Sequence, residues 1–262
     1  MDHFNIKGKV VLVTGSTQGI GLALAKGFIN AQCQVYLNGR NQEKLEATLT
    51  DLKAQGYSAQ GIAFDVANEA QVNQGMDQIL QEQGKLDVLV NNAGIIRRNK
   101  LEDLSLADWQ DVINTDLNGP FITSKHAANT MISQKSGKII NICSLMSEIG
   151  RDTVGAYAAA KGGLKLLTKN MAVEWARHNI QINGIGPGYI STPINEPYRE
   201  PGNPLNEYIL SRTPAQRWGT PEDLVGTALF LASPASDFIN GQIMYVDGGL
   251  LASLGDPWWG KD

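Results

Sequence analysis

The sequence predicts an α/β protein in which a parallel sheet is covered by helices on both faces. Short apolar runs alternate with segments of helical spacing along nearly the whole chain. Several of these runs are apolar at consecutive positions, as in strands that are buried on both sides. A glycine-rich turn joins the first run to a helical segment. Together these observations are typical of a doubly wound parallel sheet, the Rossmann fold.

The first strand is expected at Val10–Val13, a run too short for a helix, and helical spacing follows from Leu22 to Ile29. The later pairs repeat this order: strand 35–38 with helix 41–55, strand 59–64 with helix 69–83, strand 86–90 with helix 109–134, and strands 139–142 and 180–185 around a helix that contains Tyr157.

The length and composition indicate one large domain over residues 1–262. A chain of 262 residues with 42% hydrophobic content can bury a full core and stays within the usual size of one domain. The stretch from Ser191 to Pro204 contains four prolines that should break any helix. We expect this stretch to begin a substrate lid over about residues 191–215, because such loops beside a cleft are often functional.

Charge and cysteine content exclude several classes of partner. The net charge of −4 and the lack of a basic run argue against nucleic acid, and no apolar stretch approaches the length of a membrane span. Cys33 and Cys143 both lie in apolar, strand-like segments. They are expected to be buried thiols of a reducing compartment, so the sequence predicts a cytoplasmic protein without a disulfide or metal site.

The first strand-to-helix turn predicts a dinucleotide site. Gly15, Gly19 and Gly21 would let the backbone approach a pyrophosphate, with Thr17, Gln18 and Ile20 between them. The N-terminus of the following helix attracts such an anion through its free N–H groups and its dipole. The spacing Gly-x-x-x-Gly-x-Gly differs from the commoner Gly-x-Gly-x-x-Gly, but the strand before it and the helix after it are the required context.

The end of the second strand favours NADP, with NAD as a possible second cofactor. A carboxylate at this position would bind the ribose 2′-hydroxyl and exclude a phosphate, but the sequence has Asn38-Gly39-Arg40-Asn41. The Arg40 guanidinium suits a phosphate instead. The alternative is a solvated arginine in a loop.

Tyr157, Lys161 and Ser144 are the candidate catalytic residues. Tyr157 and Lys161 stand four residues apart, so on a helix they share one face. A free phenol titrates near ~10 and is a poor base at neutral pH, but a neighbouring ammonium favours the phenolate. Ser144 would hold the carbonyl or alkoxide oxygen. A Tyr-x-x-x-Lys pair alone is weak evidence for a catalytic site, since many exposed helices contain such a pair.

In their order along the chain, the glycine turn, Asn91-Asn92-Ala93-Gly94, Ser144, Tyr157-x-x-x-Lys161 and Pro187-Gly188 resemble the short-chain dehydrogenase/reductase family. The resemblance implies hydride transfer at a nicotinamide, with Tyr157 as acid and base, Ser144 positioning the carbonyl and Lys161 on the nicotinamide ribose. It also implies a homotetramer, and cofactor contacts from the following residues: Asp65, Val66, Asn92, Ala93, Gly94, Tyr157, Lys161, Pro187, Gly188, Ile190 and Thr192.

The family's fourth catalytic position departs from its usual asparagine. Counting back from Phe121 places this position at Asp116. An aspartate can still accept hydrogen bonds near Lys161, but its negative charge would alter the proton relay. Asp116 is therefore a candidate catalytic residue that differs from the family pattern.

Charged residues on the loops after the strands indicate a polar, anionic substrate. Arg97, Arg98, Glu148 and Arg151 follow strand ends, where ligands bind in such sheets. Arginine suits a carboxylate or phosphate, whereas a steroid or fatty chain would need apolar walls. The alternative is that these arginines are surface or subunit-contact charges.

Longer segments, among them 92–98, 138–144, 156–170 and 183–190, resemble the gluconate 5-dehydrogenases of this family. That resemblance implies reversible oxidation of D-gluconate at C5, with the arginines, Glu148, Ser144 and Tyr157 around the substrate. Another sugar-acid reductase, for example of the 2-deoxy-D-gluconate type, or a 3-oxoacyl-thioester reductase, would share the same catalytic residues.

Two functions from other classes stay open. The fold could hold NADP without turnover, as a sensor, although a sensor need not keep Ser144, Tyr157 and Lys161. A role in assembly is suggested by the C-terminal residues, where Leu250-Leu251 and Trp258-Trp259 could form a subunit interface.

Overall fold

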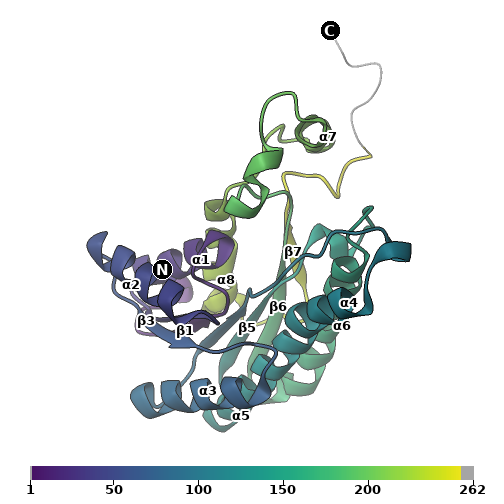
Figure 1. The fold of residues 1–262 in the computed structure, drawn as a ribbon. Helices are drawn as coiled ribbons and strands as arrows, with labels where there is room; N and C mark the ends of the chain where they lie inside the picture. Colours follow the sequence, from purple (N-terminus) through teal and green to yellow (C-terminus); the bar gives the residue numbers. More distant parts are fainter. Residues whose placement is uncertain (1, 255–262) are drawn as a thin grey trace.

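The protein forms a single seven-stranded sheet in which every strand is parallel to its neighbours, in the order β3-β2-β1-β4-β5-β6-β7. It is described from a computed structural model, which covers residues 2–254 (Figure 1). The predicted interface at Trp258-Trp259 lies outside the described residues. The predicted doubly wound sheet is confirmed.

The strands are β1 (Val10–Val13), β2 (Gln34–Gly39), β3 (Gln60–Ala63), β4 (Val88–Asn91), β5 (Gly137–Ile142), β6 (Ile180–Pro187) and β7 (Ile243–Val246). The α-helices are α1 (Gly19–Asn30), α2 (Gln42–Ala54), α3 (Glu69–Gln83), α4 (Leu106–Ile113), α5 (Gly119–Gln134), α6 (Gly155–Trp175), α7 (Pro204–Arg212) and α8 (Val225–Ala232). Short helices are η1 (Asp2–Phe4), η2 (Leu101–Asp103), η3 (Asn114–Asn118), η4 (Leu145–Ser147), η5 (Ala176–His178), η6 (Pro193–Tyr198), η7 (Pro221–Leu224) and η8 (Pro234–Ser236).

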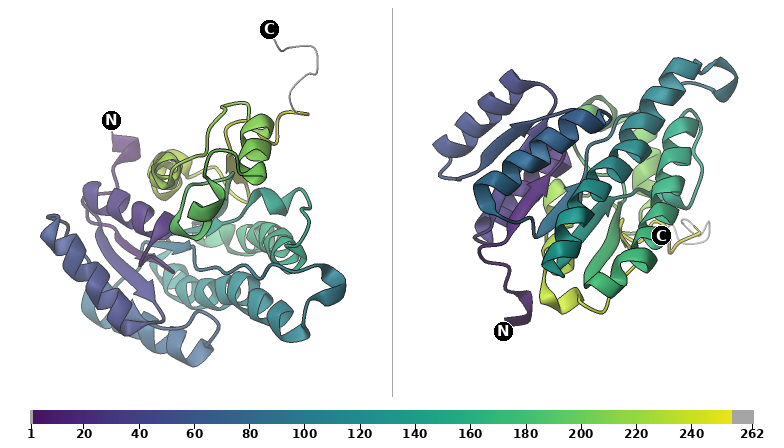
Figure 2. Two further views of the ribbon diagram at one scale, coloured as in Figure 1. Left: turned by 45° about the horizontal axis from the view of Figure 1, so that its top comes forward. Right: turned by 90° about the horizontal axis from the view of Figure 1, so that it is seen from below.

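Two hydrophobic clusters cover the two faces of the sheet. Val11 and Val13 pack with α1, α2 and α8, whereas Val10 and Leu12 pack with α3, α5 and α6. This follows from the strand geometry, because successive side chains point to opposite faces. Figure 2 shows the helices on the two faces of the sheet from further directions. Strands β1, β4, β5 and β6 are buried at every position, which explains the continuous apolar runs of β1 and β4. β5 and β6 also bury polar side chains, namely those of Lys138, Asn141, Gln181 and Asn183.

The helix predicted over residues 109–134 is divided by a π-helical segment. α4 ends at Ile113, η3 has π geometry from Asn114 to Asn118, and α5 begins at Gly119. The extra residue in this turn is not visible in the apolar spacing. π segments of this kind often occur at functional sites, and this one carries Asp116.

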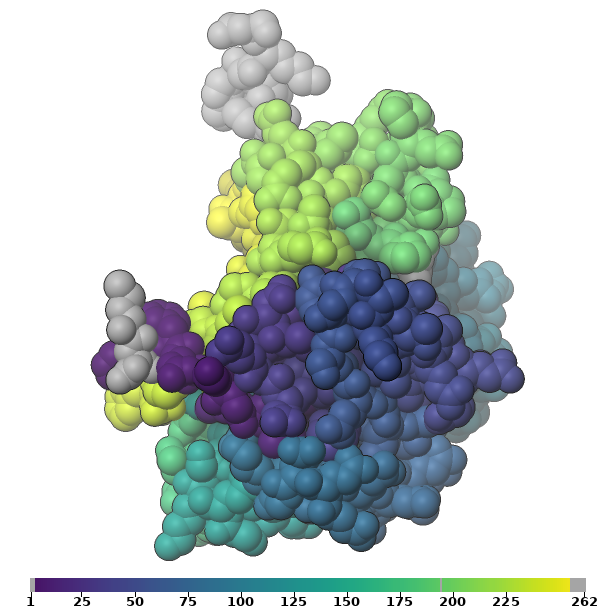
Figure 3. Space-filling view, turned by 90° about the vertical axis from the view of Figure 1, so that its left-hand side faces the viewer, coloured from purple at the N-terminus to yellow at the C-terminus, as the bar shows by residue number. Residues whose placement is uncertain are grey.

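The prediction that the prolines of 191–204 would prevent any helix is wrong. Pro193 and Pro204 stand in the first turn of η6 and α7, where a proline has no backbone bond to lose. η6 and α7 lie above the carboxyl ends of the strands (Figure 1). In Figure 3 this segment, in green, stands above the part of the molecule formed by α1 and α2. We refer to residues 191–215 as the lid segment, although the predicted movement of a lid stays a prediction.

Candidate active site

A cavity of about 910 Å³ lies at the carboxyl end of the sheet, between the strand ends and the lid segment. Its walls come from the loops after β1, β2, β3, β4, β5 and β6. The predicted site residues that line it are Gly15, Thr17, Gln18, Gly19, Ile20, Arg40, Asp65, Val66, Asn92, Ala93, Gly94, Arg97, Arg98, Asp116, Ser144, Arg151, Tyr157, Lys161, Pro187, Gly188, Ile190 and Thr192. The structure therefore brings nearly all of the predicted site together. The role of each residue stays a prediction.

The glycine turn forms one wall through its backbone. Gly15 has φ of 61°, and a Cβ there would stand 2.7 Å from Cα of Ala93. Gly19 has φ of 57° at the start of α1, where a side chain would again be strained. Nδ2 of Asn92 donates to the carbonyls of Thr14 (3.0 Å) and Gly15 (2.9 Å), which ties the β4 loop to the turn. The result is a shallow cradle at a helix N-terminus, which fits a pyrophosphate.

Gly21 does not line the cavity, so its prediction as a cofactor contact is corrected. A Cβ at Gly21 would stand 2.4 Å from Nδ2 of Asn92 and 2.6 Å from the carbonyl oxygen of Gly15. This glycine lets α1 pack closely against the turn. It therefore supports the shape of the cavity wall without lining the cavity.

Arg40 and Lys44 line the cavity at the exposed start of α2, where Arg40 precedes the N-cap residue and Lys44 lies in the first turn. Asn41 caps this helix by accepting from the Lys44 backbone N–H at 2.8 Å. The Lys44 side chain donates to Oε1 of Gln18 in the glycine turn. Lys44 therefore contacts the turn, and Arg40 lines the same cavity four residues earlier, although only Arg40 was predicted. Lys44 could have been found from the sequence, because it stands four residues after Arg40 at the start of the predicted helix.

Asn38 is a buried polar residue that the predictions left out. Its Oδ1 accepts from Gly15 N at 3.3 Å, and its Nδ2 donates to the carbonyls of Ile62 and Phe64, both at 3.1 Å. It thus connects β2 with the glycine turn and with β3. A polar side chain in an otherwise apolar strand end was the sequence signal, because buried amides are retained where they are satisfied.

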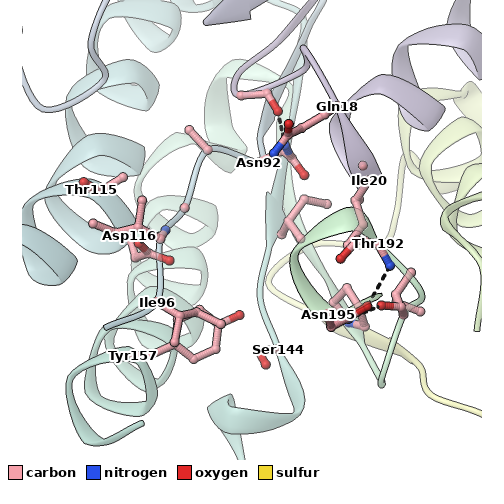
Figure 4. A pocket seen from close by; sticks show the side chains of 18 of the residues that line it. Gln18, Ile20, Asn92, Ile96, Thr115, Asp116, Ser144, Tyr157, Thr192 and Asn195 are labelled. Atoms are coloured by element: carbon pink, nitrogen blue, oxygen red, sulfur yellow. Dashed lines mark hydrogen bonds between the residues drawn. The ribbon is translucent and has the colours of Figure 1, made fainter. Parts of the chain in front are cut away.

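Tyr157 and Lys161 share one face of α6, as predicted. Nζ of Lys161 lies 5.5 Å from the centroid of the Tyr157 ring and donates to the Ile142 carbonyl at 2.9 Å. The hydroxyl groups of Tyr157 and Ser144 point into the same space of the cavity (Figure 4). The arrangement supplies a phenol, an ammonium and a second hydroxyl around one reacting oxygen, which suits acid and base catalysis.

Ser144 is held at the start of η4. Its Oγ accepts from Met146 N at 3.1 Å, and its N–H donates to Oγ of Ser147 at 3.3 Å. Ser147 in turn donates to the Lys161 carbonyl at 2.9 Å. These hydrogen bonds fix the loop after β5 to α6. They therefore hold Ser144 in place relative to the helix that carries Tyr157.

Asp116 forms a buried ion pair with Lys161. The Asp116 side chain is fully buried, its Oδ1 accepts from Ile95 N at 2.8 Å, and its Oδ2 lies 3.3 Å from Nζ of Lys161. Burial raises the pKa of Asp116, against the opposing effects of Lys161 and the Ile95 N–H. Burial alone would lower the pKa of Lys161, but the neighbouring Asp116 carboxylate raises it above its usual value. The ion pair keeps the ammonium charged next to Tyr157.

The three predicted arginines have different surroundings. Arg97 is neutralised by α4, with Nη2 2.7 Å from Asp111 and Nε 3.5 Å from Asp108. Arg98 instead stacks over the Tyr198 ring of the lid segment, at 5.7 Å.

Arg151 stacks over the ring of Tyr189, also at 5.7 Å. No ion pair is formed by Arg98 or Arg151 with any residue in the described range 2–254. These two guanidinium groups are therefore the better candidates for binding an anion.

The structure contradicts the prediction that Glu148 binds substrate. Glu148 does not line the cavity, and its carboxylate accepts from Lys165 at 2.5 and 2.6 Å and from the Tyr245 hydroxyl at 2.5 Å. These bonds lower the pKa of Glu148. The residue joins the end of η4 to α6 and β7, and its charge is already matched.

The substrate end of the cavity has further walls that the predictions did not include. They come from the lid segment and the neighbouring loops: Ile95, Ile96, Thr115, Leu145, Met146, Val154, Tyr189, Asn195, Tyr198, Leu205, Ile209 and Trp218. Several of these side chains are shown in Figure 4. Trp218 packs edge-on against Tyr189 and donates to Asn206 at 2.7 Å. No local pattern marks these positions, because they meet only after the lid segment folds back over the sheet.

Two kinds of feature are absent from residues 2–254. No helix in this range has the length and apolar character to cross a bilayer. No cluster of three or more histidine, cysteine, aspartate or glutamate side chains in the same range is placed to hold a metal ion.

Comparison with known proteins agrees with the geometry. A family model described as short chain dehydrogenase matches residues 9–203. The chain is 52% identical to a 2-dehydro-3-deoxy-D-gluconate 5-dehydrogenase of Formosa agariphila, over 98% of both chains. It is 45% identical to a gluconate 5-dehydrogenase of Gluconobacter oxydans, over 97% of this chain and 98% of the relative.

Among solved structures, a gluconate 5-dehydrogenase from Burkholderia cenocepacia in complex with NADP and tartrate superposes with a TM-score of 0.92. It is 43% identical and covers 97% of this chain and 99% of its own. The predicted family resemblance is confirmed. The matched motifs, the parallel sheet and these full-length relatives together show that the chain belongs to the short-chain dehydrogenase family.

Proposed function

We propose that this oxidoreductase uses NADP to oxidise D-gluconate reversibly at C5, giving 5-dehydro-D-gluconate. The observation that carries the proposal is the meeting, in one cavity, of the Tyr157–Lys161–Ser144 group with the unpaired guanidinium groups of Arg98 and Arg151. The first group suits transfer of a hydroxyl proton, and the second suits a carboxylate. The gluconate 5-dehydrogenase relatives support the choice of sugar acid.

Each residue has a separate task in the proposed oxidation. Tyr157 accepts the proton of the C5 hydroxyl, and Ser144 donates a hydrogen bond to the oxygen as its charge develops. Lys161 stabilises the phenolate from within the helix. When bound, the oxidised nicotinamide accepts the hydride that leaves C5. In the reducing direction Tyr157 returns the proton to the carbonyl oxygen.

The cofactor end of the cavity fits NADP. The cradle formed by Gly15 and Gly19 would hold the pyrophosphate, and the Arg40 and Lys44 side chains would bind the 2′-phosphate. The Burkholderia structure that contains NADP supports this choice. NAD would lack the phosphate contacts, so it is the weaker cofactor. Asp65 and Val66 would border the adenine.

A second candidate substrate is 2-dehydro-3-deoxy-D-gluconate, oxidised at the same carbon. The relative at 52% identity carries this name. Both substrates are six-carbon acids with a hydroxyl at C5, so the same catalytic residues and arginines would serve either one. They differ at C2 and C3, where the walls near Arg151 and Tyr189 would discriminate.

Reduced-nicotinamide absorbance tests the proposal directly. Purified enzyme is mixed with NADP or NAD and with D-gluconate, 2-dehydro-3-deoxy-D-gluconate or 2-deoxy-D-gluconate, and a 3-oxoacyl thioester is offered in the reducing direction. We expect the highest kcat/KM for D-gluconate with NADP. A higher value for another acid would keep the hydride chemistry and replace the substrate. NADP binding without turnover of any compound would indicate a sensor instead.

We infer a homotetramer from the apolar surface of α5 and α6. Phe121, Leu166 and Val173 are 48%, 61% and 80% exposed, which is unusual for a group of large apolar side chains on neighbouring helices. Light scattering of the purified protein should give the mass of four chains. Leu166→Glu should reduce that mass, whereas Phe238→Glu, at an exposed apolar side chain outside both helices, should not.

We further propose that residues 1–262 act as one domain whose lid segment closes over the substrate in the cytoplasm. The lid segment supports this through Thr192, Tyr198 and Leu205, which line the cavity. The two buried free thiols support a reducing compartment. Limited proteolysis should cleave within 191–215, and substrate with NADP should slow that cleavage. Fractionation should recover the activity with cytoplasmic markers.

A further inference from the structure

Asp116 stands where the family usually has an uncharged asparagine, and its carboxylate is in an unusual place for a charge. It is fully buried in the π-helical segment and packs against the backbone of Gly94, where a Cβ would lie 2.7 Å from its Oδ2. Oδ1 accepts from Ile95 N, but Oδ2 forms no hydrogen bond with the described residues. The only cation paired with it in that range is Lys161, at 3.3 Å.

The charges around Asp116 are few. From α6 it faces Lys161 and Tyr157, with Lys165 farther along the helix in an ion pair with Glu148. Directly after β5, Cys143 interacts electrostatically with Lys161, and burial raises the pKa of its thiol to about 11, so the thiol is uncharged at working pH. On α4, Asp108 and Asp111 are exposed and pair with Arg97.

On α5, Lys125 pairs with Glu69 of α3, and His126 lies 3.6 Å from the same carboxylate. The local balance at the reacting tyrosine is thus set by Lys161 and Asp116. An ionised Asp116 leaves this pair without net charge. A family member with asparagine would keep a net positive charge at the same place.

We propose that Asp116 is a positioning residue that raises the pH at which the Tyr157–Lys161 pair gives up its proton. The direction of this pH shift is the same whether Tyr157 or Lys161 releases the proton, because a fixed negative charge opposes proton loss from either group. The deprotonated pair is the active base, so activity toward the sugar acid falls below that pH. This inference rests on the proposed function for the identity of the base.

Asp116→Asn tests the proposal by removing the charge while keeping the shape. The acidic limb of kcat/KM for oxidation should move down by about one pH unit, which is a tenfold gain in the deprotonated fraction below the midpoint. Asp116→Ser, a second neutral variant, should move the limb in the same direction. Asp77→Asn, which removes one charge from exposed α3, should leave the limb in place.

A measurement without substrate or cofactor separates this inference from the proposed function. The tyrosinate absorbance of the free enzyme is titrated, and the titration of the Tyr157→Phe variant is subtracted to isolate Tyr157. The same subtraction is made in the Asp116→Asn background. The midpoint of the Tyr157 titration should be about one pH unit lower there than with Asp116 present. An unchanged or higher midpoint would overturn the proposal, since Asp116 would then be protonated or electrically silent. A shift without any sugar-acid turnover would keep the inference and remove the proposed substrate.

Discussion

The cofactor end and the substrate end of the cavity differ in what lines them. The cofactor end is formed mainly by the backbone of the glycine turn, with Gly15 held against Ala93 and the carbonyl of Thr14 bound to Asn92. The substrate end is formed by side chains from several separate segments, among them Arg98, Arg151 and those of the lid segment. The first end is fixed by backbone that packs closely against the loop after β4, whereas the second depends on side chains from several distant segments.

This contrast explains how the family can keep one reaction and change its substrate. A backbone cradle tolerates little variation, because a single added Cβ collides with the opposite loop. Side chains on loops can be exchanged without moving the sheet. Tyr157 stands at the boundary, since it rests on rigid α6 and faces both ends.

The largest effect is expected at that boundary. Tyr157→Phe removes the group that transfers the proton, so kcat should fall by roughly a thousandfold, within the range for a general acid or base. NADPH binding, followed by fluorescence titration, should stay within about twofold because the phenol is not part of the cradle. Near wild-type kcat in this variant would reject the mechanism.

Gly15→Ala should break the cofactor end alone. The new Cβ would stand 2.7 Å from the Ala93 backbone in a residue with positive φ, so NADPH binding should weaken by up to about a hundredfold. Gly8→Ala is the matched control, because Gly8 also has positive φ (75°) but no atom lies within 4 Å of its Cβ position. It should lower the Tm through backbone strain and leave the cofactor affinity unchanged.

If both variants weakened NADPH binding equally, the effect would come from strain and not from the contact with Ala93. The substrate KM of Gly15→Ala, measured at saturating cofactor, should stay close to wild type. A large rise in that KM would show that the two ends are not independent.

The same contrast decides what the sequence could predict. The strands, the glycine turn and the Tyr157–Lys161 face follow from local spacing, because strand and helix geometry fix which neighbours point the same way. Glu148 was assigned wrongly because its partner Tyr245 is 97 residues away and gives no local signal. Gly21 was correctly assigned to the glycine turn, but it packs against Asn92 and Gly15 and does not face the cavity.

The interruption of the helix at Asn114–Asn118 was missed for a related reason. A π turn adds one residue to a helix whose apolar spacing otherwise continues, so only the environment of Asp116 reveals it. The lining from Tyr198 and Trp218 was also absent from the predictions. Tyr198 reaches the cavity through the fold of the lid segment, and Trp218 does so from just beyond that segment, where it contacts Tyr189 and Asn206.

At the substrate end, Arg98→Ala and Arg97→Ala should differ although the residues are adjacent. Arg98→Ala removes an unpaired guanidinium, and the KM for D-gluconate should rise about thirtyfold with a smaller change in the cofactor KM. Arg97→Ala removes a group already bound to Asp108 and Asp111, so its effect should be within about threefold. Steady-state kinetics with saturating NADP measures both. Equal losses would mean that Arg97 leaves its aspartates for the substrate.

The smallest effect is expected where side chains, and not backbone, border the cofactor. Arg40→Asp replaces the predicted phosphate-binding group with the carboxylate that suits a ribose hydroxyl, so the ratio of kcat/KM for NADP to that for NAD should fall about tenfold. Lys44 remains to bind part of the phosphate, which limits the loss. Lys53→Asp, at the other end of α2 and away from the cavity, makes the same change in charge and should leave the ratio unaltered. If both variants lowered the ratio alike, general electrostatic attraction would account for the preference. If neither did, the cofactor choice would lie in the backbone cradle, and the cofactor end would contain no exchangeable specificity element.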